Sequence, residues 1–188
     1  MKRLFIAINL PDEVKNRIKK IIGDTADFRW IPSKNWHLTI VFLGNQPDEA
    51  IIPILESIKK AGQNFSAPAI KFEKIILAPP NKEPRMIWLK CAKQTSKILG
   101  EIKNNLENNL IDNGVRFKIE NRPFNAHLTL ARFESILENF SPYGGSPVGR
   151  QLPNSPISQL PISFTAESID LMESRLKRSG AEYDILTK

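Results

Sequence analysis

The chain has very little cysteine: Cys91 is the single thiol among its 188 residues. One thiol cannot form an intrachain disulfide, so the sequence excludes the small disulfide-stapled folds of secreted proteins. Cys91 stands in an apolar run, where a small buried side chain is the usual interpretation. We therefore expect a protein of a reducing compartment, the cytoplasm.

Long apolar runs are also missing. The first residues, Met1-Lys2-Arg3, are followed by seven largely apolar residues before Pro11. That run is too short to cross a bilayer and has no small-residue cleavage site. We expect neither a targeting signal nor an association with a membrane.

Several catalytic signatures have no counterpart in the sequence. There is no glycine-rich phosphate loop, no CxxC pair and no HExxH motif, and a chain with two histidines lacks the third that an ordinary zinc set needs. Nothing marks a serine or cysteine as a nucleophile beside a histidine. These absences predict chemistry that uses neither a metal nor another cofactor.

Basic residues exceed acidic ones, 27 against 20, which gives a formal charge of +7 and an isoelectric point near 9.6. Such an excess attracts phosphate-rich partners over long range, but it serves surface solubility equally well. A chain of this length, 41% hydrophobic, can bury a sizeable core. We expect a single bilobal domain over residues 1–188, with interleaved halves.

Apolar periodicity predicts an order of strand, helix and strand that occurs twice, with the closing strands beginning at His37 and His127. Gly62 and Gly114 are placed to end two of the helices. The repeated order suggests an internal duplication. The expected strands are residues 4–10, 37–43, 70–77, 85–92, 127–133, 168–176 and 182–186, the expected helices follow Pro11 and span 47–61 and 96–111, and the proline-rich residues 141–161 are expected to form a long loop.

Both histidines of the chain begin the same pattern, in His37-Leu38-Thr39-Ile40 and His127-Leu128-Thr129-Leu130. On a strand, residues two apart project from the same face, so each histidine shares a face with its threonine. The alternate residues, Leu38, Ile40, Leu128 and Leu130, then point into the core. Imidazole can give or take a proton near neutral pH, and hydroxyls can donate hydrogen bonds to phosphate oxygens. Two such motifs in one site would suit phosphodiester cleavage.

Alternatives to this hypothesis stay open for single residues. A histidine on a strand is more often structural than catalytic, and one copy of the motif alone would be a weak signal. Strict alternation places Arg132 on the face opposite His127 and Thr129, unless the strand ends or bulges there. The tryptophans are either core or a stacking platform for a base, and the two phenylalanines that follow the motifs are expected in the core. These aromatic residues are Trp30, Trp36, Trp88, Phe42 and Phe133.

The motifs resemble those of the two-histidine phosphoesterase superfamily. Within it, residues 3–8, 37–44 and 127–132 are similar to the RNA 2′,3′-cyclic phosphodiesterases, also called 2′-5′ RNA ligases. The resemblance implies an α+β fold with two pseudo-symmetric lobes, each an antiparallel sheet with outer helices, around a central cleft. The chain differs from the family pattern at Ala126, where many members have proline, and at Ile40-Val41, where leucine and lysine are more usual.

The resemblance also implies an activity and a role for each site residue. The expected reaction opens a terminal 2′,3′-cyclic phosphate to a 2′-phosphate, with His37 as proton donor to the 3′ oxygen and His127 as proton acceptor from water. Thr39 and Thr129 would hold the phosphate, and Arg132 matches the arginine after the second motif. The same chemistry run in reverse would join RNA ends by a 2′-5′ linkage.

Two other functions remain as alternatives. One is a phosphodiesterase for small cyclic phosphates such as ADP-ribose 1″,2″-cyclic phosphate, and the other is a module that binds RNA or a nucleotide without turnover. The expected partner in the leading hypothesis is an RNA with a 2′,3′-cyclic phosphate end or a cyclic nucleotide. We expect the protein to act as a monomer.

Overall fold

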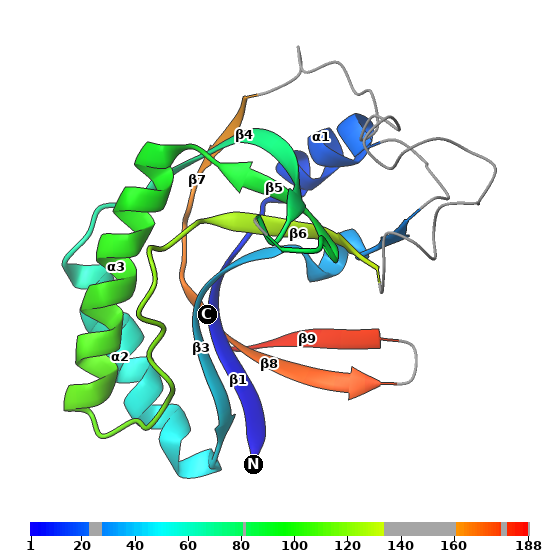
Figure 1. The fold of residues 1–188 in the computed structure, drawn as a ribbon. Coiled ribbons are helices and arrows are strands. Elements are labelled where there is room, and N and C mark those ends of the chain that lie inside the picture. The colour runs from blue at the N-terminus through cyan, green and yellow to red at the C-terminus, as the bar shows by residue number, and fades with distance from the viewer. Residues whose placement is uncertain (23–27, 81, 134–160, 178–179, 188) are drawn as a thin grey trace.

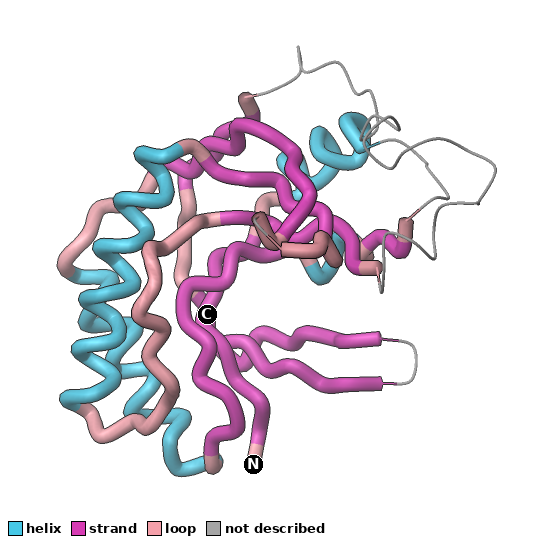
Figure 2. Tube along the Cα trace, in the orientation of Figure 1, coloured by secondary structure: helices cyan, strands magenta, loops and turns pink. Residues whose placement is uncertain are grey.

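The structure, a computed structural model, describes residues 1–22, 28–80, 82–133, 161–177 and 180–187. Its strands form two sheets in which every neighbouring pair is antiparallel, and its helices lie outside them (Figures 1 and 2). The α+β fold with two antiparallel sheets is therefore confirmed. Most of the segment expected to be a long loop, residues 141–160, lies outside the described residues.

The four-stranded sheet carries the first motif and has the order β3-β1-β8-β9. The five-stranded sheet carries the second motif and has the order β2-β6-β5-β4-β7. The bounds in the first sheet are β1 Lys2–Asn9, β3 His37–Gln46, β8 Asp170–Lys177 and β9 Gly180–Thr187; those in the second are β2 Arg29–Trp30, β4 Ala69–Ala78, β5 Met86–Cys91, β6 His127–Arg132 and β7 Ile162–Thr165.

Helix α1 (Asp12–Ile22) begins one residue after Pro11, with two acids in its first turn and two lysines in its last, which suits the helix dipole. Its apolar stripe, from Val14 to Ile22, is buried. Helices α2 (Ile51–Gln63) and α3 (Lys93–Asp112) lie side by side, with α3 against β3 and α2 against β8 (Figure 1).

Two glycines predicted to end helices behave differently. Gly114 follows α3 with φ of +75°, a conformation that glycine adopts without strain, and its N–H bonds to the carbonyl of Ile111. Gly62 lies inside α2, which continues to Gln63, so that prediction was wrong. The expected helix over 47–61 is also divided, because residues 48–50 form a turn of 3₁₀ helix before α2 begins.

One hydrophobic core extends through both sheets and the helices α1, α2 and α3. On the four-stranded sheet it takes the side chains of one face, such as Ile6, Ile8 and Leu38, which are at most 1% exposed. The opposite face of that sheet carries a separate small cluster of Phe5, Ala7 and Met172. The first motif lies on this same opposite face, because the ring of His37 is in contact with that of Phe5.

The strand, helix and strand order recurs with the same pairing in both halves. In β1-α1-β3 the outer strands pair with each other, and in β5-α3-β6 they do so again. His37 is paired with Asn9, and His127 is paired with Lys90. The two histidines therefore occupy the same place in two copies of one local architecture.

Candidate active site

His37 begins β3 directly after a 3₁₀ turn formed by Ser33–Asn35. The turn is held by Trp36, whose indole N–H donates to the carbonyl of Ile31 at 2.8 Å, and by the amide of Asn35, which donates to the carbonyl of Ala181 at 2.8 Å. The Nδ1 atom of His37 lies 2.8 Å from the carbonyl oxygen of Asn35. A carbonyl can only accept, so Nδ1 carries the hydrogen and Nε2 is the atom left to exchange a proton.

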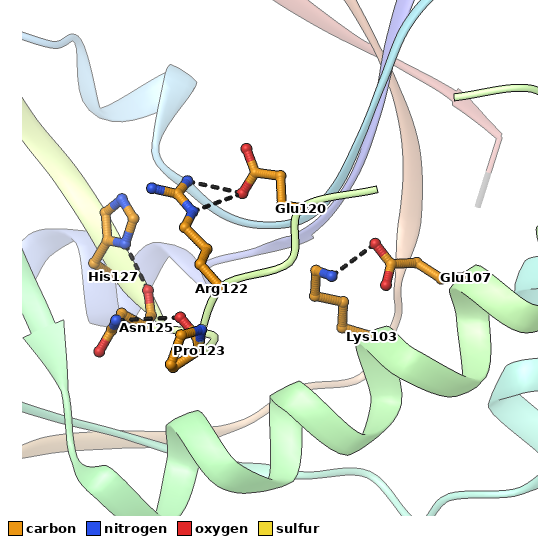
Figure 3. A network of polar contacts seen from close by, with 7 residues as sticks. All are labelled: Lys103, Glu107, Glu120, Arg122, Pro123, Asn125 and His127. Atoms are coloured by element: carbon orange, nitrogen blue, oxygen red, sulfur yellow. Dashed lines mark hydrogen bonds and ion pairs between the residues drawn. The ribbon is translucent and has the colours of Figure 1, made fainter. Parts of the chain in front are cut away.

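His127 repeats this arrangement at the start of β6. Its Nδ1 atom lies 2.7 Å from the carbonyl oxygen of Asn125, two residues earlier (Figure 3). Among the described residues, no hydrogen bond is made by Nε2 of either histidine. The shared geometry has a signal in the sequence that the four-residue motif omits, because the repeated pattern is longer, Asn-x-His-Leu-Thr, and begins at Asn35 and Asn125.

Each motif strand contains one extra residue immediately after its threonine. Thr39 pairs with Ala7 and Val41 pairs with Ile6, which leaves Ile40 unpaired between them. Thr129 and Ala131 bracket Leu130 in the same way. An inserted residue of this kind shifts the alternation of side chains by one position.

The bulges bring the residue five positions after each histidine back to the face of the histidine and threonine. The two residues before it are buried in both strands, while Phe42 is 58% exposed and Arg132 is exposed. The placement of Phe42 in the core was therefore wrong, since strict alternation does not hold past Ile40. Arg132 instead follows the bulge alternative, which puts its guanidinium on the side of His127 and Thr129.

The two motifs lie close together although they belong to different sheets. Strand β6 passes next to β3 (Figure 1), and the residue that follows β2, Ile31, bonds through its N–H to the carbonyl of Leu130 at 2.8 Å. Charge on Arg132 and on His127 acts on His37, and Arg132 also acts on His127. The structure thus brings His37, His127 and Arg132 into one electrostatic environment. Thr39 and Thr129 are half-buried on the same strands.

Burial is the main reason that the pKa of each histidine lies below its usual value, because a charged imidazole loses hydration inside the protein. The hydrogen bond to the carbonyl of Asn35 or Asn125 opposes that effect. Nearby positive charge then lowers the pKa further, from Arg132 and His127 at His37, and from Arg122 and Arg132 at His127. An anion bound between these groups would offset their positive charge and so raise the pKa of both histidines.

Arg122 lies in the loop that precedes β6 and forms two hydrogen bonds with one carboxylate oxygen of Glu120, at 2.9 and 2.8 Å (Figure 3). Its side chain is 70% exposed. The ion pair offsets part of its charge, so Arg132 is the better placed of the two to bind an anion.

Aromatic rings surround both histidines, and only one of these rings is among the candidate platforms predicted from the sequence. The ring of His37 lies 4.8 Å from that of Phe5 and 4.9 Å from that of Tyr183, while His127 stacks on Trp88 at 3.7 Å. The other two tryptophans belong to the core, where Trp36 is buried and Trp30 packs half-buried, as Phe133 does. Trp88 is therefore the tryptophan whose stacking on a motif histidine makes it part of the site.

Other catalytic groups are not gathered here within the described residues. Burial raises the pKa of the Cys91 thiol to about 12, so this cysteine stays protonated and packs as a small core side chain. In the part of the chain that the structure describes, no group of three histidine, cysteine or carboxylate side chains is arranged for a metal ion. Its helices include none that is long and apolar enough to span a membrane.

Comparison with known proteins identifies relatives of the whole chain. The model of the family described as LigT like Phosphoesterase matches twice in succession, over residues 8–88 and 89–183. The chain is 24% identical over 178 residues to the RNA 2′,3′-cyclic phosphodiesterase of Bacillus subtilis, a match that covers 93% of this chain and 89% of that protein.

Solved structures show the same fold. The crystal structure of TT0787 of Thermus thermophilus is similar with a TM-score of 0.69 at 23% identity, covering 98% of this chain and 95% of that one. Escherichia coli LigT complexed with 3′-AMP has a TM-score of 0.67 at 24% identity, with 99% and 95% of the two chains covered. The boundary between the two family matches, at residues 88 and 89, falls in β5, the first strand of the second motif unit.

Proposed function

Because the chain belongs to the LigT-like phosphoesterase family, we propose that it hydrolyses the 2′,3′-cyclic phosphate at the end of an RNA to a 2′-phosphate, without a metal ion. The relatives at about 25% identity that are named RNA 2′,3′-cyclic phosphodiesterases support this substrate. The observation that carries the proposal is the matched pair of imidazoles, each with Nδ1–H bonded to a backbone carbonyl and Nε2 available for proton transfer.

In the proposed reaction a water oxygen attacks phosphorus as the bond from phosphorus to the 3′ oxygen breaks. Nε2 of His127 takes a proton from the water, and Nε2 of His37 gives one to the departing 3′ oxygen. Both protons are accounted for, and the enzyme ends with the charge moved from His37 to His127. The resting state follows by a return of that proton through solvent.

The proposal requires His37 to be protonated when substrate is bound, although burial and positive charge lower its pKa in the free protein. The phosphodiester carries a negative charge, which favours the imidazolium. Arg132 would bind the non-bridging oxygens, with hydroxyl hydrogen bonds from Thr39 and Thr129 on either side. Binding of the substrate would therefore favour the protonated form of His37 that the reaction requires.

Phe42 supports a nucleotide rather than a bare phosphate as the substrate. Its exposed ring follows the first motif on the face of His37, and lies 6.4 Å from Phe5, which in turn contacts that imidazole. Exposed aromatic rings beside a phosphate site stack on bases of any sequence. We place the base of the terminal nucleotide on Phe42, and the formal charge of +7 would draw the RNA strand to the protein.

The test is hydrolysis of a short RNA ending in a 2′,3′-cyclic phosphate, in excess chelator, with product analysis. We expect a 2′-phosphate product, and turnover lowered by at least about 10²-fold when His37 and His127 are both changed to alanine. A Lys60→Ala variant on the exposed surface of α2 is the matched control and should retain full activity. Full activity in the double variant, or activity only with added metal, would refute the proposal.

Two further arms of this experiment separate the alternatives. ADP-ribose 1″,2″-cyclic phosphate turned over faster than RNA would make a small cyclic phosphate the substrate, and binding without product would make the protein an RNA-binding module. Adding an RNA with a free 5′ hydroxyl tests ligation, since that oxygen can attack in place of water and yield a 2′-5′ linkage. We propose ligation as the minor path, because water is far more concentrated than any RNA end.

A further inference from the structure

His127 differs from His37 in the ring that lies against it. The indole of Trp88 stacks on the imidazole of His127 with centroids 3.7 Å apart and planes 23° from parallel. At His37 the contacts are of another kind, because Tyr183 meets the imidazole edge-on at 83° and Phe5 is tilted by 38° at a longer distance. Within the described residues, the second histidine alone rests on the full face of an aromatic ring.

The internal repeat does not demand this stack. Trp88 on β5 pairs across the ladder with Thr129, and the residue in the same place of the first unit is Ala7, paired with Thr39. An alanine supports the identical strand pairing and the identical bulge. Strand pairing and the bulge therefore do not require the indole, which the second unit has and the first unit lacks.

The indole also carries a cost that a phenylalanine would avoid. Nε1 of Trp88 is buried, and it has no hydrogen-bond partner among the described residues. A buried N–H without an acceptor opposes folding, whereas an apolar ring of similar shape would not. What an indole has beyond a phenyl ring at this position is its larger and more electron-rich face.

Burial, and after it the charges of Arg122 and Arg132, oppose the protonation of His127. Arg122 in the preceding loop and Arg132 on β6 act on it directly, Lys90 is its cross-strand partner on β5, and His37 approaches from β3. The hydrogen bond to the carbonyl of Asn125 favours the imidazolium. A cation over the face of an indole is attracted by the ring, and tryptophan provides the strongest such attraction among the aromatic side chains.

We propose that Trp88 is a positioning residue for the second histidine, holding its imidazole so that Nε2 is presented for proton transfer and stabilising the imidazolium that forms when it accepts a proton. The role in turnover rests on the proposed function, while the stabilisation of the imidazolium does not. Two contacts fix the ring of His127, the hydrogen bond at Nδ1 and the stack on its face. Trp88 therefore acts on the reaction through His127.

The test is a titration of the two imidazoles by NMR in Trp88→Phe and Trp88→Leu variants. The chain has two histidines, so two signals are followed, and a His37→Asn variant assigns them. We expect the pKa of His127 to fall by about 0.4 to 1 unit in Trp88→Leu and by less in Trp88→Phe, with His37 nearly unchanged. Phe5→Leu is the matched control, which should move His37 and leave His127 in place.

The direction of the shift decides between two roles. If Trp88 merely shielded His127 from water, its removal would hydrate the imidazole and raise the pKa. A rise, no change, or an equal shift of both histidines would overturn the proposal. This titration needs no substrate, so its outcome is separate from the failure of the proposed function.

Turnover gives a second readout. With RNA ending in a 2′,3′-cyclic phosphate, we expect Trp88→Leu to lower kcat about tenfold with little change in KM, and Trp88→Phe to lower it less. A purely structural role would instead lower the amount of folded protein and leave kcat of the folded fraction intact. Thermal unfolding measures that fraction, and Trp88→Phe keeps the test usable should the leucine variant not fold.

Discussion

The two motif strands share a backbone and differ in the side chains placed on it. Both have a histidine held by the carbonyl two residues earlier, a threonine, and a bulge that returns the residue five positions after the histidine to the same face. That residue is Phe42 in one strand and Arg132 in the other. Equivalent positions of the two halves thus carry an exposed aromatic ring in one and a cation in the other, which suits the proposed substrate, with a base at one end and a phosphate at the other.

The largest effect is expected from the histidines, where the two halves should be equivalent. Changing His37 or His127 alone to alanine should lower kcat about 10²- to 10⁴-fold, because each removes one positioned proton-transfer group. The double variant should be little worse than either, since the groups act as one unit. Single-turnover rates measure this, and full additivity of the two losses would contradict it.

A smaller loss is expected at Arg132, where the halves differ. Arg132→Ala should lower kcat/KM about 10²- to 10³-fold, because it removes the positive charge that stabilises the negative charge developing on the phosphate oxygens in the transition state. Arg132→Lys should recover part of that loss, since a lysine provides the charge without the two-pronged geometry. Arg122→Ala is the comparison, and because Arg122 is paired with Glu120 its loss should be several-fold at most. An equal loss at both arginines would remove the distinction between them.

Phe42 should show a still smaller effect, and one that depends on the substrate. Phe42→Ala should raise KM for an RNA end by about tenfold through lost stacking, while Phe42→Tyr keeps the ring and should remain near normal. A cyclic phosphate without a base should be unaffected. Ile52→Ala, at an exposed apolar residue of α2, controls for surface changes in general. A loss of the same size with the baseless substrate would exclude base stacking.

The smallest effect is expected on stability. Folding lowers the pKa of both histidines, so between that lowered value and the ordinary one near 6.5 the unfolded chain binds more protons than the folded protein. The free energy of unfolding should therefore decrease as the pH falls from about 7.5 through the ordinary histidine value of about 6.5 toward the lowered values in the folded protein. Urea unfolding measures the slope, and changing both histidines to glutamine should flatten it. An unchanged slope would show that folding does not perturb them.

Much of the fold could be predicted because it depends on local patterns. Apolar periodicity placed α1 and α3, and the ends of β4 and of the hairpin β8-β9 fell within about two residues of their predicted limits. Alternation correctly buried Leu38, Ile40, Leu128 and Leu130. Where a single inserted residue changed the register, as it does before Phe42, the pattern predicted the wrong face.

The aromatic environment of the site could not be predicted, because it depends on pairing between distant segments. Trp88 reaches His127 only because β5 pairs with β6, and Tyr183 reaches His37 only because the hairpin β8-β9 adds to β1. In the sequence these rings are indistinguishable from core residues. Neighbours across a ladder are set by strand order, which local propensity does not contain.

The sequence alone determined that two equivalent histidine and threonine motifs exist, and that each stands on a strand with its leucines buried, since both follow from residue type and a period of two. Tertiary structure decided that the motifs meet, that bulges turn Phe42 and Arg132 toward them, and that the second imidazole is backed by an indole. These depend on contacts between segments far apart in the chain. Such contacts form only when burying a common core outweighs the entropy of closing the chain between them.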